Sequence, residues 1–246
     1  MIEWQDEAFI LGYRTFGENK VIVSLFTKTH GHVSGMMRQT KASRVQGVVQ
    51  MGNRVHAHWK ARLEEHLGYL SLDRMESVAG YVLGHPIKLL ILTAASCLMT
   101  SVFPERHPYP VMYQALDQLI MSLKGGEFIE TYVHFEQRVL REMGFGLKLE
   151  KCCVSGDTEN LVYVSPKTGR AVSQKEGEPW DEKLLKLPAF LIGTHGGAPT
   201  FEEIRQAFVL MSHFFQQHMT ETSYGKIMDA RQQLLRAIEK ERELTA

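Results

Sequence analysis

The sequence is poor in cysteine and has no apolar run long enough to cross a membrane. Its three cysteines, two of them adjacent, cannot build a disulfide framework, which points to a reducing compartment. The uncharged run from Leu89 to Phe103 is shorter than the ~20 residues that a bilayer requires, so we expect a buried helix there. The acidic N-terminus does not fit a signal peptide. We therefore expect a cytoplasmic protein without a membrane anchor.

Two motifs of catalytic chemistry are also missing from the sequence. It has no Gly-x-x-x-x-Gly-Lys-Ser/Thr phosphate loop, so we expect no ATP hydrolysis. His195-Gly196-Gly197 resembles the oxyanion loop of some esterases, but no Gly-x-Ser-x-Gly segment exists to supply the nucleophile. A loop between helices explains these residues better. We expect a protein that is not an enzyme and has no small-molecule substrate.

The pattern of apolar residues changes along the chain. Up to about Leu72, short alternating segments separated by turns predict five strands, the number in a small closed barrel of the oligonucleotide-binding (OB) type. From Ser77 onward, apolar residues recur three or four apart, which predicts helices. Thr200 and Glu203 form a predicted capping box at the start of one helix. We therefore expect an α+β protein with an OB barrel over residues 1–76 and a helical domain over 77–246, with a loop-rich insertion around 149–173 that holds a short hairpin.

Positive charge is concentrated in the predicted barrel. Residues 20–63 include eight lysines and arginines and no acidic residue, whereas the rest of the chain has 20 basic against 28 acidic residues. A positive barrel attracts polyanions through phosphate contacts and counterion release, without reading bases. The alternative is a solvated face that serves solubility. We predict that the barrel binds nucleic acid through Lys20, Lys28, Arg38, Lys41, Arg44, Arg54, Lys60 and Arg62.

Two details refine this prediction. Trp59 or Tyr69 could stack a base, although such aromatic residues more often belong to a barrel core. The segment from Arg38 to Arg44 has three positive charges separated by small or polar residues, and we expect it to follow a phosphate backbone.

The order of these segments resembles that of the RecO family of bacterial DNA repair and recombination proteins. The resemblance rests on Gly17-Glu18, on Leu25-Phe26-Thr27 leading to His30-Gly31, on the basic segment 38–44 and on Met143-Gly144-Phe145-Gly146-Leu147, and it covers essentially the whole chain. It implies an OB domain joined to a helical domain, and a nucleoid-associated mediator without catalytic turnover. Such a protein binds single- and double-stranded DNA, anneals strands coated by single-strand-binding protein, and works with RecR to help load RecA.

Some members of this family have a four-cysteine zinc knuckle in the helical domain. On this chain the first cysteine pair becomes Cys152-x-x-Ser155, and the second falls near Ser173-x-x-Glu176. Serine is a poor zinc ligand, and the adjacent Cys153 does not restore a tetrahedral site. We therefore expect a degenerate knuckle without zinc, and no other cofactor.

Two His-x-His pairs, His30/His32 and His56/His58, support a rival interpretation. Alternate residues of a strand share a face, so each pair could offer two imidazoles to one metal ion. A metal-dependent hydrolase would normally add a carboxylate, and the surrounding segment has none. We favour exposed histidines that add to phosphate binding at lower pH.

The helical domain is large for a part that only clamps DNA. The resemblance implies that it docks the acidic, hydrophobic-tipped tail of single-strand-binding protein in an apolar groove with a positive rim. Arg138 and Arg141, on the helix that ends before Gly144, are our candidates for that rim. The alternative is a helical protein-interaction scaffold with only incidental DNA affinity.

Overall fold

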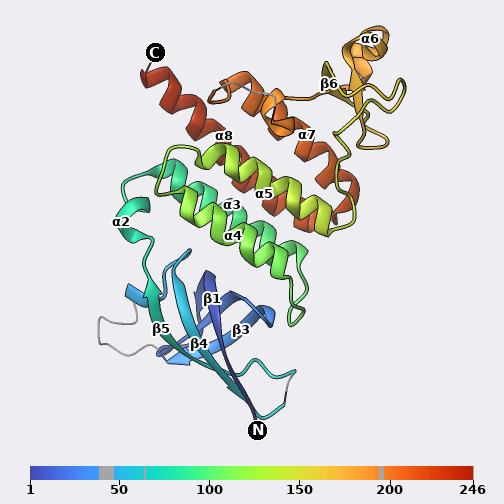
Figure 1. Cartoon of the computed structure of the whole chain (residues 1–246). Helices are drawn as coiled ribbons and strands as arrows, with labels where there is room; N and C mark the ends of the chain where they lie inside the picture. The colour runs from blue at the N-terminus through green and yellow to red at the C-terminus, as the bar shows by residue number, and fades with distance from the viewer. Residues whose placement is uncertain (39–46, 64, 194–196, 246) are drawn as a thin grey trace. The chain divides into compact units, whose positions relative to one another are not determined.

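The computed structural model describes residues 1–38, 47–63, 65–193 and 197–245. They form two compact units, Met1–Lys124 and Gly125–Ala246, which we describe separately (Figure 1). The first unit combines strands with helices, and the second is mainly helical. The α+β class predicted from the two patterns is confirmed.

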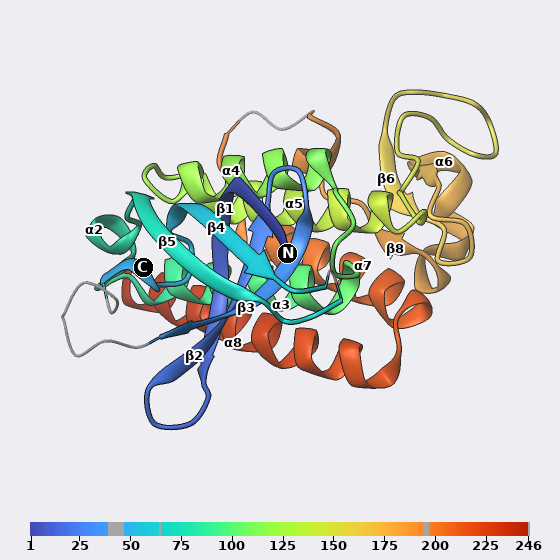
Figure 2. The ribbon, with the colours of Figure 1, turned by 90° about the horizontal axis from the view of Figure 1, so that it is seen from below.

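The first unit begins with a closed five-stranded barrel, as the alternating pattern predicted. Its strand order is β1-β2-β3-β5-β4, and Figure 2 shows these strands from below. All neighbouring strands pair antiparallel except β3 and β5, which meet as a parallel pair at Met36 and Tyr69. The strands are β1 (Ile2–Thr15), β2 (Lys20–Thr27), β3 (Gly31–Arg38), β4 (Arg54–Ala61) and β5 (Tyr69–Glu76).

Side chains alternate between the inside and the outside of this barrel, because successive residues of a strand point to opposite faces. The inside is an apolar core that includes Ile10, Leu25 and Trp59. On the outside, Phe9 lies 5.1 Å from the ring of Tyr113, and Phe26 lies 6.1 Å from the ring of Phe103. Phe103 caps the end of α3 and Tyr113 lies on α4, so these pairs join the barrel to that part of the unit. The helices of this unit are α2 (Ala79–Val82), α3 (Pro86–Val102) and α4 (Pro110–Ser122).

The turn between β2 and β3 requires a glycine. Gly31 has φ +69°, and a Cβ atom at this position would lie 1.8 Å from the carbonyl oxygen of His107. Only glycine satisfies both the left-handed backbone and this close approach. The His30-Gly31 pair is therefore needed for the barrel to lie against the segment between α3 and α4.

The uncharged run at Leu89–Phe103 is helical and largely buried, as expected. It forms most of α3, in which Ile91, Ala95 and Leu98 are fully buried. In the described part of the chain, no helix is long and apolar enough to span a bilayer.

The described residues of the second unit form three longer helices and a small sheet. In the sequence, the sheet falls between the first two of these helices. The β6–β7 hairpin falls in the segment where the sequence predicted one, and β8 adds a third strand to it. Thr200 and Glu203 form the predicted capping box. The elements are α5 (Phe128–Glu142), β6 (Leu161–Val164), β7 (Ala171–Ser173), α6 (Gln174–Gly177), η1 (Glu178–Lys183), β8 (Leu185–Lys186), η2 (Ala189–Ile192), α7 (Phe201–His218) and α8 (Glu221–Thr245).

The change from strands to helices follows Glu76, where β5 ends. The first compact unit nevertheless continues through α3 and α4 to Lys124. The functional boundary between residues 76 and 77 stays a prediction.

Candidate nucleic-acid interface

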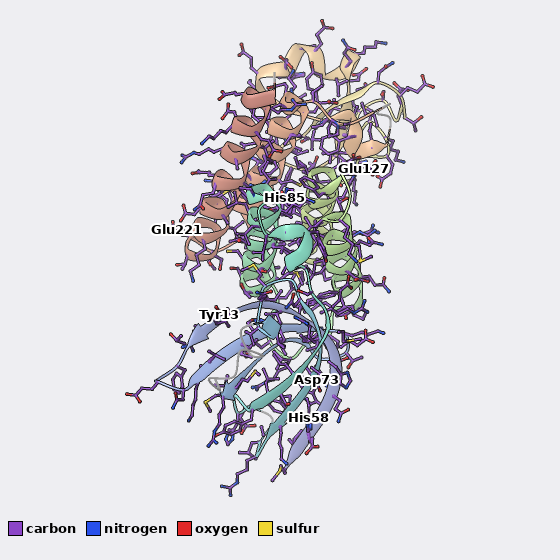
Figure 3. The ribbon with its side chains drawn as sticks, turned by 90° about the vertical axis from the view of Figure 1, so that its left-hand side faces the viewer. Tyr13, His58, Asp73, His85, Glu127 and Glu221 are labelled. Carbon is purple, nitrogen blue, oxygen red and sulfur yellow. The ribbon has the colours of Figure 1, made fainter. Side chains whose placement is uncertain are left out.

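The basic residues of β4 lie on the outside of the barrel but face acidic partners. Arg54, His56, His58 and Lys60 alternate with core residues, and the neighbouring strand β1 places Glu3, Gln5 and Glu7 beside them. Figure 3 labels His58 on this face.

Two of these contacts are ion pairs that neutralise positive charge. The Arg54 Nη2 atom lies 2.8 Å from Glu7 Oε2, and the Lys60 Nζ atom lies 3.5 Å from Glu3 Oε2. The hydrogen bond from Arg54 lowers the pKa of Glu7, and that from His58, followed by the charge of Lys60, lowers the pKa of Glu3. These pairs are not evident from the sequence, because Glu3 and Glu7 precede the acid-free segment 20–63. Pairing of β1 with β4 brings their carboxylates next to the basic residues of that segment. Residues 1–76 as a whole contain ten basic and eight acidic residues. The excess of positive charge on the barrel is therefore smaller than residues 20–63 alone suggest.

The outer face of β2 and β3 is different. Lys20 pairs directly with Arg38, and Arg14 of β1 pairs with Ile22, two residues from Lys20. Cross-strand partners share a face of the sheet, so the three cations lie together. We call Arg14, Lys20 and Arg38 the basic face. Among the described residues, none of the three side chains has an ion-pair partner.

Arg14 was not among the predicted contacts, because this residue precedes the acid-free segment 20–63. Of the other predicted contacts, Lys28 and Arg62 are exposed just after β2 and β4. Lys28 lies close enough to Glu7 for its charge to lower the pKa of that carboxyl, after the larger effect of the Arg54 hydrogen bond. Lys41 and Arg44 lie outside the described residues.

Trp59 cannot serve as a stacking platform. It is only 2% exposed, its indole N–H donates to the Leu67 carbonyl at 3.0 Å, and its ring stacks on Trp4. Gly68 lies so close that a Cβ atom there would be 2.4 Å from the indole. The prediction of stacking at Trp59 is therefore wrong, because core packing covers both faces of the ring. Tyr69, which is 58% exposed, stays a candidate.

Neither histidine pair forms a recognisable metal site. His32 is buried beside the Ser24 hydroxyl at 2.8 Å, whereas His30 lies 3.1 Å from the Asp6 carboxylate. Burial lowers the pKa of His32. Within residues 1–38, 47–63, 65–193 and 197–245, no group of three or more histidine, cysteine, aspartate or glutamate side chains could hold a metal ion.

The degenerate knuckle is organised around a single sulfur. The Cys152 Sγ atom accepts hydrogen bonds from the Ser173 backbone N–H at 3.3 Å, the Ser173 hydroxyl at 3.5 Å and the Val154 N–H at 3.5 Å. Burial raises the pKa of this thiol, but hydrogen bonds from Ser155 and Ser173 outweigh it and lower the pKa to about 6. One thiol and two hydroxyls do not fit zinc, which takes thiolate and imidazole ligands in structural sites.

The second unit has a mixed cavity of about 810 Å³ beside the end of α5. Arg138 and Arg141 both line it, as does Lys148 from the following segment. Leucine side chains supply an apolar part, and Glu150 is the acidic residue in the lining. The structure therefore brings the two predicted rim arginines to one cavity and adds a third cation. The leucines are Leu147, Leu149 and Leu191.

Comparisons with known proteins cover almost the whole chain. Residues 1–81 match the family model described as Recombination protein O N terminal, and residues 84–224 match Recombination protein O C terminal. The chain is 41% identical to the DNA repair protein RecO of Methylobacterium nodulans, with 89% of this chain and 90% of that protein covered. It is 38% identical to DNA repair protein RecO of Rhodospirillum centenum (94% and 92% covered) and of Bartonella quintana (97% and 98% covered). An OB-type barrel followed by helices, matched over most of the chain at this identity, places the chain in the RecO family of DNA repair proteins.

Proposed function

We propose that this protein is a recombination mediator that binds single- and double-stranded DNA and anneals complementary strands. Together with RecR and single-strand-binding protein, it assists the loading of RecA at the nucleoid. One observation carries the DNA-binding part of this proposal: the basic face is the cluster of cations on the described barrel that no acid neutralises. Family membership supports the repair role.

The mechanism needs only binding energy. Contacts from Arg14, Lys20 and Arg38 to phosphates release counterions and leave base edges free. Exposed base edges are what annealing requires, because the two strands must still read each other. Binding is therefore tolerant of sequence and weakens strongly with salt.

The mixed cavity of the second unit supports the docking of an acidic tail. Its cations Arg138, Arg141 and Lys148 line the cavity together with leucine side chains, so an acidic peptide with an apolar end meets complementary charge and apolar surface. Holding the protein that coats DNA at this cavity raises the local concentration of the strands, and pairing accelerates without a chemical step. An interaction scaffold with incidental DNA affinity is the second candidate, and this cavity is the observation that favours it.

The DNA-binding proposal is tested by comparing two double variants of equal charge. Lys20→Gln/Arg38→Gln removes two cations of the basic face, whereas Arg54→Gln/Lys60→Gln removes two that acids already neutralise. Fluorescence anisotropy of a labelled single strand, measured over a range of salt, gives affinity and its salt dependence. We expect the first variant to bind more weakly, with a slope of log affinity against log salt that is shallower by roughly 0.7 per lost contact.

The control variant should bind nearly as the wild type does. Equal weakening of both variants would mean that only net charge matters, and wild-type affinity in the first variant would remove the basic face from the interface. Adding Lys41→Gln and Arg44→Gln to each background extends the test to the rest of the predicted basic segment.

The tail-docking part is tested separately. An acidic peptide with the sequence of the partner's tail is titrated into Arg138→Ala and Arg141→Ala, with Arg205→Ala as the control on an exposed helical surface. We expect weaker binding in the first two variants only. Unchanged affinity in both would remove these arginines from the rim.

A further inference from the structure

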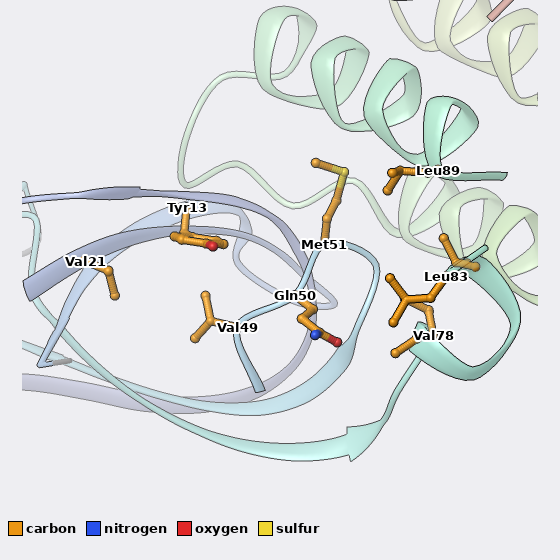
Figure 4. Close-up of a pocket in the computed structure, with 10 residues that line it drawn as sticks. Tyr13, Val21, Val49, Gln50, Met51, Val78, Leu83 and Leu89 are labelled. Atoms are coloured by element: carbon orange, nitrogen blue, oxygen red, sulfur yellow. The ribbon is translucent and has the colours of Figure 1, made fainter. Parts of the chain in front are cut away.

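A second cavity, of about 400 Å³, opens on the barrel unit (Figure 4). Tyr13 and Val21 of β1 and β2 lie at one end with Val49, and Leu83 and Leu89 lie at the other. Apart from the Tyr13 hydroxyl, the polar side chain of the lining is Gln50. Its size falls within the range of roughly 300 to 1,000 Å³ that small ligands occupy.

This cavity exposes apolar surface that a monomer would normally cover. Tyr13 is 58% exposed, Leu83 66% and Leu89 48%. Contiguous apolar side chains of this exposure mark interaction sites. Tyr13 supplies the aromatic ring of the lining, and its exposure leaves ring surface for a flat ligand.

The cavity and the basic face share the same two strands. Tyr13 precedes Arg14 on β1, and Lys20 precedes Val21 on β2. Successive residues point to opposite faces, so the end of the β1–β2 hairpin has cations on one side and the apolar cavity on the other. A flexible strand that passes around this end can contact cations with its phosphates and the cavity with a base.

We propose that the cavity holds an unpaired nucleobase of single-stranded DNA, stacked on Tyr13. The proposal rests on the proposed function and deepens it, since it supplies a reason for selecting single strands. Paired bases are stacked inside a duplex and cannot enter. Aromatic stacking accepts every base, because every base has a π face.

The charge near the cavity favours an anionic partner over a neutral protein segment, and the flat ring of Tyr13 favours a base. The three cations of the basic face have no ion-pair partner among the described residues. The acidic residue of this hairpin is Glu18, in its turn. Single-stranded DNA fits both the cations and the apolar cavity, because it has regularly spaced anions and flat apolar rings. The Gln50 amide can donate to or accept from the edge of the enclosed base.

The test compares oligothymidine with an abasic strand of the same length, which has the same phosphates and no bases. Wild-type protein should bind oligothymidine more tightly than the abasic strand. Tyr13→Ala should weaken binding to oligothymidine about 5- to 150-fold, leave binding to the abasic strand and to duplex DNA unchanged, and preserve the salt slope. Tyr13→Phe keeps the ring and should restore affinity, whereas Tyr13→Leu should not.

Tyr69→Ala tests the other stacking candidate on the barrel, because Tyr69 is equally exposed at 58% and lies on β5. The nucleobase site would be overturned if Tyr13→Ala lost as much affinity for the abasic strand as for oligothymidine, or if only Tyr69→Ala bound oligothymidine more weakly. Either result would leave the proposed function intact. Full affinity of Tyr13→Leu for oligothymidine would also overturn it, because an apolar side chain without a ring would then serve as well as the tyrosine. If the wild type binds none of the three DNA probes, the proposed function fails, and this site fails with it.

Discussion

Arg231 of α8 and Glu136 of α5 form a fully buried, two-point ion pair. The Nε–Oε1 distance is 2.6 Å and the Nη2–Oε2 distance is 3.0 Å, and the side chains are 1% and 0% exposed. Arg231 also donates to the Phe208 carbonyl at 3.1 Å and to the Ser212 hydroxyl, both on α7. One guanidinium therefore connects the three long helices of the second unit, and its direction specifies their register.

Removing either partner of this pair should destabilise the second unit strongly. Arg231→Ala or Glu136→Ala leaves an uncompensated buried charge, which costs about 3 to 5 kcal/mol. Urea unfolding monitored by circular dichroism measures this loss. Arg205→Ala breaks the exposed pair with Glu202, which is 54% exposed, and should change the unfolding free energy little because water screens the pair. Similar losses in both variants would contradict this interpretation.

The carboxylate of Asp6 should make stability depend on pH in the acid range. Burial raises its pKa, but hydrogen bonds from the Thr29 N–H and hydroxyl and from His30 outweigh burial and lower the pKa below 3.8. A carboxyl with a lowered folded pKa contributes stability above its unfolded pKa and loses it as pH falls through the folded value. Asp6→Asn should therefore cost about 1 to 3 kcal/mol at pH 7 and less at pH 3, below the ordinary pKa of the carboxyl.

Unfolding curves of wild type and Asp6→Asn at both pH values check this expectation. Asp73→Asn, at an exposed position on β5, is the control and should differ little from the wild type at either pH. A constant difference between Asp6→Asn and wild type at all pH values would show that the contribution does not come from ionisation.

Cys152 should stabilise the knuckle through its thiolate rather than through a metal. Its folded pKa of about 6 lies below the ordinary thiol value of 9.0, so its contribution is complete above pH 9 and is lost as pH falls to about 6. The difference in unfolding free energy between wild type and Cys152→Ser should therefore grow from pH 6 to pH 9. Cys153→Ser, at the adjacent and half-buried cysteine, is the control and should give a smaller difference at pH 9.

Metal removal gives an independent check of the same knuckle. A chelator should leave the melting temperature of the wild type unchanged, because one thiol and two hydroxyls do not fit zinc. A chelator-dependent loss of stability that zinc restores would contradict the thiolate interpretation.

Gly31 and Gly17 separate backbone strain from steric clash. Both have a left-handed backbone, with φ +69° and +68°, but a Cβ atom at Gly31 would meet the His107 carbonyl, whereas nothing lies within 4 Å of one at Gly17. Gly17→Ala should cost only the left-handed conformation, about 1 to 2 kcal/mol. Gly31→Ala should cost a further 1 to about 3 kcal/mol because the backbone must move. Chemical denaturation measures both, and equal losses would show that the turn relaxes freely.

Local features of this protein were predictable from the sequence. The alternating segments predicted the five strands, and the capping residues Thr200 and Glu203 predicted the start of α7, because both signals depend on neighbours along the chain. The uncharged run at Leu89–Phe103 predicted a buried helix for the same reason.

Tertiary structure decided which of the predicted contacts remain available. Pairing of β1 with β4 neutralised Arg54 and Lys60, packing in the barrel buried Trp59, and the register of β1 with β2 added Arg14 to the basic face. The Glu136–Arg231 pair joins residues that are 95 positions apart. The spacing of apolar residues predicts which face of a single helix or strand is buried. Whether a charge is neutralised or an aromatic ring is covered depends on which helices and strands pack together. Sequence therefore determined the elements and the chemistry available, and folding selected the surface that is free to bind.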